Sequence, residues 1–221
     1  MQTTLHACGL LEKSFSPGEQ AVRLFDADHG LRPPLLPRRS GYEIRPARTA
    51  HQHGMASMLV RQVYARRGYH CESVEPQAEE PNRLTLAAWH DDEILATLTL
   101  GRDSPAGLLA DALYARELDR LRRPDRTLCE VIRLAVAPNS SSSDLLITLI
   151  QACPQHAAQV FGASDLVTEV NPRHAPYYQR LWGFRQIGEL RQCPRVNAPA
   201  VLLHRQVEDF GLATTHRSWN T

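Results

Sequence analysis

The chain has almost no net charge, no long apolar run and no obvious leader. Its 221 residues contain 25 Lys or Arg and 24 Asp or Glu, a formal net charge of +1, so bulk charge gives no argument for nucleic-acid binding. No apolar stretch reaches membrane-spanning length, and we therefore expect no integral membrane segment. Residues 1–11 lack the charged-then-apolar layout of a secretory signal, which favours a cytoplasmic protein.

Metal-ligating residue types are present but are not grouped. The 5 cysteines and 10 histidines form no CxxC pair and show no spacing typical of a zinc site. An odd number of scattered cysteines is typical of reduced thiols rather than of a disulfide framework. The sequence therefore predicts no metal site.

Proline content and polarity divide the chain into three parts. Residues 1–41 contain the proline-rich run Leu31–Pro37, which excludes a regular helix or a central strand there. We expect an irregular arm, either a disordered N-terminal extension or a lid over a site. Residues 42–208 form the expected domain, and residues 209–221 form a polar tail.

Hydrophobic periodicity predicts alternating strands and helices in the expected domain. In chain order these are a strand at 42–46, a helix from the capping pair Thr49 and Gln52 to about Arg67, a hairpin at 83–90 and 93–100, a helix at 107–122, a strand at 128–137, a helix from Asp144 with a kink or new turn at Pro154, a strand at 165–170, a helix at 174–182, and strands at 184–191 and 200–207. This order indicates an α/β (α+β) fold with a central mixed, mostly antiparallel sheet flanked by helices.

The strand at 128–137 carries two charges, Glu130 and Arg133, although buried strands are usually apolar. Buried charges are normally paired or used in chemistry. Residues i and i+3 of a regular strand point to opposite faces, so separate roles are easier than direct contact, which would need a bulge. Glu130 is a candidate base or ammonium ligand, and Arg133 a candidate carboxylate ligand. A structural ion pair, or an Arg133 brace to the 107–122 helix, is the alternative.

Six short motifs stand out along the domain. They are Gly107–Asp111, Glu117-Leu118, Leu121-Arg122, Cys129–Val136, Glu169–His174 and Cys193–Ala200. Together they resemble the long-chain N-acyl amino acid synthases of the N-acyltyrosine synthase type, which have the GNAT acyltransferase fold. The spacing from Asn171 to Tyr178, followed by Gly183-Phe184, is similar to GNAT chains in general.

This resemblance implies a GNAT-like domain and an enzyme that joins a long-chain acyl group to the amino group of an amino acid. The acyl donor would be an acyl carrier protein or coenzyme A thioester, and no further cofactor is implied. Two alternatives stay open. Glu130 and Arg133 also resemble acyl-homoserine lactone synthases, although that family's paired aspartates before the hairpin are absent, and a non-catalytic GNAT-fold lipid-binding protein is the other.

The resemblance also implies candidate site residues. The catalytic candidates are Glu130, Arg133 and Tyr178, the last as the acid that protonates the leaving thiolate. Tyr178 as a core aromatic, with Tyr177 pointing inward, is the alternative reading. The substrate-binding candidates are Arg61, Asp111, Leu134, Val136, Arg195 and Asn197. Leu134 and Val136 would contribute backbone N–H groups, whereas Arg195 and Asn197 are equally typical of a turn brace.

The loop after the charged strand bears on the donor. Ser140, Ser141, Ser142 and Ser143 stand where acetyltransferases carry a glycine-rich pyrophosphate loop. A serine loop favours the single phosphate of carrier-protein phosphopantetheine, so an acyl carrier protein is the expected partner. A basic run is a candidate docking face for an acidic carrier, with solvated surface as the alternative. Its members are Arg116, Arg120, Arg122, Arg123 and Arg126.

Overall fold

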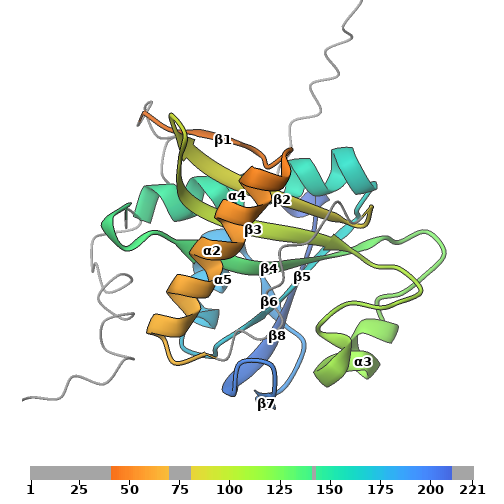
Figure 1. Cartoon of the computed structure of the whole chain (residues 1–221). Coiled ribbons are helices and arrows are strands. Elements are labelled where there is room, and N and C mark those ends of the chain that lie inside the picture. The colour runs from red at the N-terminus through yellow and green to blue at the C-terminus, as the bar shows by residue number, and fades with distance from the viewer. Residues whose placement is uncertain (1–40, 70–80, 141–142, 211–221) are drawn as a thin grey trace, which may run out of the picture. The chain divides into compact units, whose positions relative to one another are not determined.

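The computed structural model describes residues 41–69, 81–140 and 143–210 (Figure 1). The arm expected at 1–41 and the tail expected at 209–221 lie almost wholly outside the described residues. Ser141 and Ser142 also lie outside them.

Among the described residues, eight strands form a mixed sheet in the order β1-β2-β3-β4-β5-β8-β6, with β7 paired to β8 (Figure 1). The strands are β1 Glu43–Pro46, β2 Arg83–His90, β3 Glu93–Arg102, β4 Leu128–Val136, β5 Asp165–Val170, β6 Arg185–Gln186, β7 Arg191–Cys193 and β8 Ala198–Gln206. Within this set β4 and β5 pair in parallel, and the other pairs are antiparallel. The predicted mixed, mostly antiparallel sheet is confirmed.

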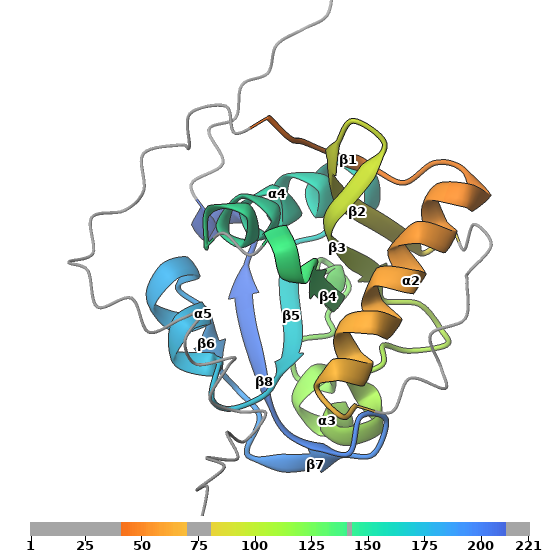
Figure 2. The same ribbon diagram turned by 60° about the vertical axis from the view of Figure 1, so that its left-hand side comes forward.

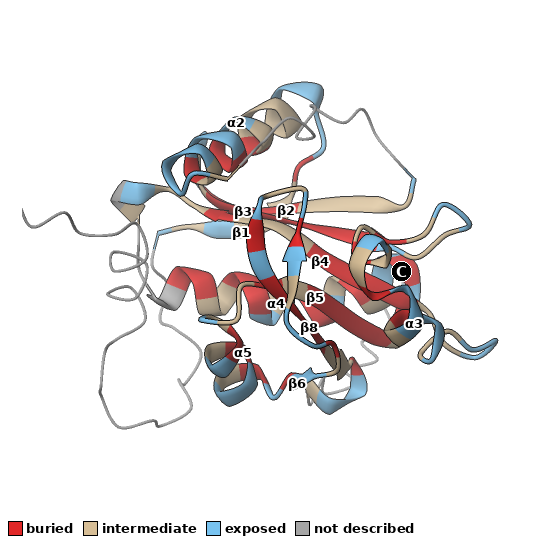
Figure 3. Cartoon of the chain, turned by 90° about the horizontal axis from the view of Figure 1, so that it is seen from below, coloured by how far each residue is buried: buried red, intermediate tan, exposed pale blue. Residues whose placement is uncertain are grey.

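Helices cover both faces of the sheet. They are α2 Ala50–Arg66, α3 Asp111–Asp119, α4 Ser143–Phe161 and α5 Ala175–Trp182. Figure 2 shows α2 and α3 on one face and α4 and α5 on the other. Figure 3 shows that buried residues are concentrated on the strands between these layers, with exposed residues on the outer sides of the helices. The helix α4 also provides the crossover that a parallel β4–β5 pair requires.

A capping box fixes the start of α2, and a buried apolar face holds α4 across a proline. The Thr49 hydroxyl accepts from the Gln52 N–H at 3.2 Å, and the Gln52 side chain accepts from the Thr49 N–H at 3.3 Å, which confirms the predicted capping box. α4 continues across Pro154 to Phe161. Because Leu149 and Cys153 are 0% exposed, burial of the apolar face keeps this helix in place around the proline.

The predicted start of the third helix is wrong. It was placed at Gly107, but α3 begins at Asp111. Gly107 has a φ of +76°, and the Asp111 carboxylate accepts from the Leu108 N–H at 2.7 Å. Residues 107–110 therefore form a turn that precedes the helix.

The predicted strand at 184–191 is also wrong, because it breaks into β6 and β7. The N–H groups of Ile187 and Gly188 both donate to the Leu202 carbonyl, at 2.9 and 3.1 Å, and two residues facing one is the pattern of a bulge. A Cβ on Gly188 would lie 2.6 Å from the ring of Tyr114. The close approach of α3 at this point interrupts the strand.

A cluster of charged side chains lies around the buried Asp165 at the N-terminal end of β5. Asp165 is 1% exposed and accepts from Arg126 at 2.6 and 2.8 Å, from Ser164 at 2.6 Å, and lies 2.8 Å from the His204 ring. Burial alone would raise the pKa of Asp165, but the hydrogen bonds from His204, Arg126 and Ser164 outweigh it and lower the pKa to about 2. The ionised form is therefore favoured in the folded state.

We expect Asp165→Asn to lower the free energy of unfolding by about 2 kcal/mol, because it removes the buried charge that accepts from Arg126 and Ser164 and leaves the partly exposed Arg126 without its charge partner. Since the folded-state pKa lies below the unfolded value, the stabilisation from Asp165 is present above pH 4 and is lost as the pH falls toward about 2. Urea unfolding at several pH values measures both effects. Asp209→Asn, at an exposed position, is the control, and equal stability of the two variants would contradict the prediction.

Candidate active site

The sheet opens along β4. Its parallel pairing with β5 covers only Leu128–Glu130. Directly beyond, the Thr168 hydroxyl donates to the Val131 carbonyl at 2.9 Å, so a side chain replaces the next backbone partner. Beyond these residues no backbone pairing joins the two strands, and their ribbons part toward the C-terminal ends (Figure 2). This stretch between the strand ends is called the gap below.

On its other edge, β4 contains a bulge. The register against β3 shifts between Thr97 and Thr99, and Arg133 has a φ of +56°. A register shift with a left-handed residue is typical of a β-bulge, which redirects the side chains that follow.

This bulge places Glu130 and Arg133 on the same face of the sheet. Glu130 lines a cavity together with Arg83, and Arg133 lines a second hollow together with Thr85. Arg83 and Thr85 are two residues apart on β2 and so share a face. The expectation that Glu130 and Arg133 point to opposite faces is wrong, because it assumed a regular strand.

The carboxylate of Glu130 is buried and held by backbone N–H groups. The side chain is 1% exposed, and it accepts from the N–H groups of Leu109 at 2.8 Å and Ala110 at 3.1 Å. Burial raises the pKa of Glu130 to about 7, while the Leu109 hydrogen bond and the Arg195 charge oppose that rise. A carboxyl with a pKa near neutrality suits a group that must take up and release a proton.

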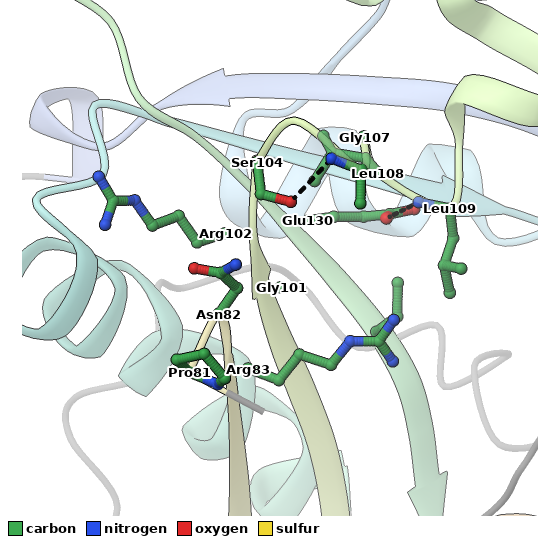
Figure 4. Close-up of a pocket in the computed structure, with 12 residues that line it drawn as sticks. Pro81, Asn82, Arg83, Gly101, Arg102, Ser104, Gly107, Leu108, Leu109 and Glu130 are labelled. Carbon is green, nitrogen blue, oxygen red and sulfur yellow. Dashed lines mark hydrogen bonds between the residues drawn. The ribbon is translucent and has the colours of Figure 1, made fainter. Parts of the chain in front are cut away.

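A cavity of about 200 Å³ lies in front of Glu130 (Figure 4). Figure 4 shows the Arg83 side chain extending from β2 across this cavity toward the side of Leu109, whereas Arg102 points the other way. Among the described residues that line it, Glu130 is the one acid. Besides Arg83, Glu130 and Arg102, whose side chain points outward, the cavity is lined by Pro81, Asn82, Gly101, Ser104, Ala106, Gly107, Leu108, Leu109 and Ile132.

Arg133 lies in a much smaller space. The hollow beside it has about 20 Å³, which is room for roughly one water molecule. Its other walls come from β2, β3 and α2, and they are mostly polar: Thr85, Thr97, Thr99, His53 and Ser57. Arg133 therefore occupies a polar socket beneath α2 rather than the larger cavity.

Leu134 lies within the bulge, between Ile132 and Ala135, and Val136 follows it. The Ala137 N–H donates to the Leu95 carbonyl at 2.8 Å, and Val136 is partnered with Ala96. Because hydrogen bonding alternates along an antiparallel ladder, the Val136 N–H is directed away from β3, toward the gap. This is the geometry expected of a backbone group that could bind an oxyanion.

Tyr178 is the more deeply buried of the two adjacent tyrosines on α5. It is 9% exposed and packs edge-to-face on Trp182 and Phe184, with ring centroids 5.1 and 5.9 Å away. Burial raises the pKa of Tyr178, so its hydroxyl stays protonated at neutral pH. Tyr177 is half-buried. Tyr178 is thus a core aromatic, and its role as the acid that protonates the leaving thiolate stays a prediction.

Arg195 braces the loop that holds Glu130. Its guanidinium donates to the Leu109 carbonyl at 2.6 Å and to Glu169 at 2.9 Å. These bonds tie the segment between β7 and β8 to the turn before α3, which supplies the N–H groups on Glu130. We interpret Arg195 as a positioning residue rather than as part of the cavity wall.

Other sequence candidates do not line the cavity. Asn197 has a φ of +48° and is exposed in the turn before β8, and Arg61 is exposed on α2. Asp111 accepts from Arg122 at 2.6 and 2.8 Å, and this hydrogen bond lowers its pKa. The expected brace from Arg133 to Asp111 or Glu117 is wrong, because Arg122 and Arg191 form those ion pairs.

The serine loop is described only at its edges. Ser140 ends a short 3₁₀ helix, its N–H donating to the Ala137 carbonyl at 2.9 Å, and Ser143 begins α4. Ser141 and Ser142 lie outside the described residues, so a phosphopantetheine site on Ser140–Ser143 stays a prediction.

Sequence reasoning missed Arg83 and the backbone N–H groups of Leu109 and Ala110. Arg83 and Thr85 alternate with Leu84 and Leu86 on β2, and this polar face of a strand was an available signal. The two N–H groups had no sequence signal, because they meet Glu130 only through the turn before α3.

Among the described residues, no three His, Cys, Asp or Glu side chains come together in a group that could hold a metal ion. In the same part of the chain, every helix is too short or too polar to span a membrane.

Comparison with known proteins identifies the family. The sequence profile described as N-acyl amino acid synthase FeeM matches residues 55–206. The chain belongs to the FeeM N-acyl amino acid synthase family. The FeeM match includes β4, the cavity in front of Glu130, Tyr178 and Arg195, so the site described above lies inside the segment that defines the family.

Solved structures agree with the FeeM assignment. The structure of FeeM, an N-acyl amino acid synthase from uncultured soil microbes, is 26% identical with a TM-score of 0.70, covering 76% of this chain and 93% of that one. An acyl-CoA N-acyltransferase from Pseudomonas aeruginosa is 16% identical with a TM-score of 0.53, over 74% of this chain and 97% of that one. NAA60 from Arabidopsis thaliana in complex with acetyl-CoA is 14% identical with a TM-score of 0.56, over 76% and 99%.

The last two share the fold, and the predicted GNAT-like architecture is confirmed. No curated protein sequence matches the chain significantly. As a member of the FeeM family, the chain is an acyltransferase.

The brace from Arg195 gives a test of the site. Arg195→Leu removes a positive charge near Glu130 and the bond to the Leu109 carbonyl. The pKa of Glu130 should therefore rise, and the ascending limb of acyl-transfer rate against pH should move up by roughly 0.5–1 unit. Arg195→Lys should restore part of the shift, because it keeps the charge. An unchanged profile in Arg195→Leu, or an equal shift in the exposed control Arg185→Leu, would contradict this role.

Proposed function

We propose that Glu130 is the general base in the transfer of a long-chain acyl group from a carrier-protein thioester to the amino group of an amino acid. The observation that carries this proposal is the buried carboxylate with a pKa raised to about 7, facing a cavity of about 200 Å³. The family supplies the reaction class, and the donor and the residue roles are our proposal.

The chemistry follows from the positions of the groups. Glu130, when ionised, takes a proton from the acceptor amine, directly or through a water molecule. The amine nitrogen then attacks the thioester carbonyl and forms a tetrahedral oxyanion. A preorganised backbone N–H of the stretch from Leu134 to Val136 stabilises the oxyanion. Leu134 is the nearer candidate, because Val136 lies about 20 Å along β4 from Glu130. The C–S bond breaks, and the departing thiolate takes a proton from the Tyr178 hydroxyl. The nitrogen gives up its remaining surplus proton, which restores the Tyr178 hydroxyl directly or through water, and Glu130 releases its proton to solvent.

The gap between β4 and β5 is the proposed position of the thioester. Val136 borders the gap, and Tyr178 on α5 lies near the end of α2, since the charges of Tyr64 and Arg67 both affect its pKa. A pantetheine arm that enters between the C-terminal ends of the strands would bring its sulfur to these groups, with the amine on the Glu130 side.

The surface around that gap is basic. His174 begins α5, and its pKa is lowered to about 4 by burial and then by the charges of Arg67 and Arg173. Arg67 and Arg173 are exposed. Two arginines at the mouth of the gap suit a phosphate or an acidic carrier protein.

The basic run at 116–126 is less suitable as a docking face. Arg122 binds Asp103, Asp111 and Asp119, and Arg126 binds Asp165, so two of its five arginines are used internally. The run also lies beside the N-terminal end of β4, a strand of nine residues, and is therefore about 30 Å from the mouth of the gap.

The pH dependence of wild-type turnover tests the base. We expect kcat/KM to rise with pH through about 7 and to fall tenfold per unit below it, because the protonated carboxyl cannot accept the amine proton. Glu130→Gln should lower kcat by about 10²–10⁴-fold and remove this limb. Glu93→Gln, exposed on the β2–β3 hairpin, is the control. A Glu130→Gln enzyme that keeps the wild-type kcat, or that keeps the rise of kcat/KM through about pH 7, would exclude Glu130 as the base.

The donor is tested with one long-chain acyl group on two carriers. We expect acyl carrier protein to give a higher kcat/KM than coenzyme A, with an advantage that declines as salt increases. Arg67→Glu with Arg173→Glu should abolish the advantage, whereas Arg116→Glu with Arg120→Glu should keep it. If only Arg116→Glu with Arg120→Glu abolishes the advantage of the carrier protein, the docking face lies on α3 instead. Equal, salt-independent use of both carriers would contradict a carrier-protein donor.

A further inference from the structure

The geometry points to Arg83 as the residue that binds the carboxylate of the acceptor amino acid, opposite Glu130, which meets its amino group. This inference rests on the proposed function and names the acceptor subsite. It makes the preferred acceptor an α-amino acid rather than an amine without a carboxylate.

Arg83 and Glu130 lie in one row across three strands. Arg83 on β2 is the register partner of Gly101 on β3, and Gly101 is the partner of Glu130 on β4. Register partners point to the same side of a sheet. Two strand spacings separate the outer backbones by about 10 Å, and the residue between them has no side chain.

Gly101 leaves space between the side chains of Arg83 and Glu130 because it has no side chain of its own. A Cβ placed on it would meet nothing nearer than the Glu130 carbonyl at 3.9 Å, so the space above it is empty rather than filled by a neighbour. Its φ is not positive, so the backbone does not require glycine. The absent side chain therefore makes room between a cation and a carboxylate.

The charges of this cavity match the two ends of an amino acid. Glu130 offers a carboxylate to the amino group, and the guanidinium of Arg83 offers the planar fork that pairs with a carboxylate. Figure 4 shows Arg83 reaching across the cavity while Arg102 points away from it. Leu108, Leu109 and Ile132 add apolar wall on which an acceptor side chain can pack.

Size decides between Arg83 and Arg133 as the carboxylate ligand. The hollow at Arg133 has about 20 Å³, against about 200 Å³ at Arg83. The first holds roughly one water molecule, whereas the second is just below the range of pockets for drug-sized ligands. An amino acid fits the space beside Arg83 and not the space beside Arg133.

The experiment compares an amino acid with its carboxamide. Each of twenty amino acids is supplied with a long-chain acyl thioester, and the best acceptor is then tested beside its own amide. In Arg83→Gln we expect the KM for the acid to rise about 10–100-fold, with kcat and the donor KM within about twofold of wild type. The KM for the amide should be unchanged by the substitution.

Two further variants complete the test. Arg83→Lys should recover part of the affinity for the acid, because it keeps the charge but loses the fork. Gly101→Ala should raise the KM for acid and amide alike, because its methyl group enters the space between Arg83 and Glu130. Arg102→Gln is the matched control, with a neighbouring cation that points away, and circular dichroism checks that each variant is folded.

An unchanged KM for the acid in Arg83→Gln, or a wild-type enzyme that accepts acid and amide equally, would overturn the assignment of Arg83. If wild-type protein transfers the acyl group to amino acids in that case, the proposed function still stands. If wild-type protein acylates none of the acceptors, the proposed function itself is wrong.

Discussion

The carboxylate of Glu130, accepting from two backbone N–H groups inside the protein, is the interaction on which the site depends. A shift of its pKa from 4.5 to about 7 means that the ionised form costs about 3 kcal/mol in the folded protein. The cost is absent below about pH 4.5, where both states are protonated, grows as the pH rises from about 4.5 to 7, and is constant above that range. The N–H groups of Leu109 and Ala110 reduce this penalty, and the surrounding packing offsets the rest.

Those two N–H groups are in place because the turn before α3 is fixed from three directions. Asp111 accepts from the Leu108 N–H and from Arg122, and Arg195 holds the Leu109 carbonyl. Below the turn, the Tyr114 hydroxyl lies 2.8 Å from the Ala200 carbonyl. Arg122 and Asp111 thus act on Glu130 through the backbone that they fix, whereas Arg195 acts both through the backbone and through its charge. This explains why the motifs around 107–122 and 193–200 accompany the charged strand.

Much of the fold was accessible from the sequence because its signals are local. The capping pair Thr49 and Gln52, the alternation of the β2–β3 hairpin and the two charges on β4 each depend on neighbours a few residues away. The bulge at Arg133 was not accessible, because a strand shows it only through its register with β3. The late start of α3 and the brace from Arg195 likewise depend on partners distant in sequence, so Glu130 was identified while the groups that tune it were not.

Because of the bulge and the parting of β4 from β5, the two ends of β4 differ in their backbone pairing. Toward its N-terminus it pairs on both sides, and the row through Gly101 holds Glu130 rigidly against the turn before α3. Toward its C-terminus the Val136 N–H is left facing a gap. A regular strand would have sent Glu130 and Arg133 to opposite faces and closed the gap with hydrogen bonds to β5. The two irregularities therefore place a cavity in front of a buried carboxylate near one end of the strand and backbone N–H groups not paired with β5 near the other, and the proposed acyl transfer draws on both.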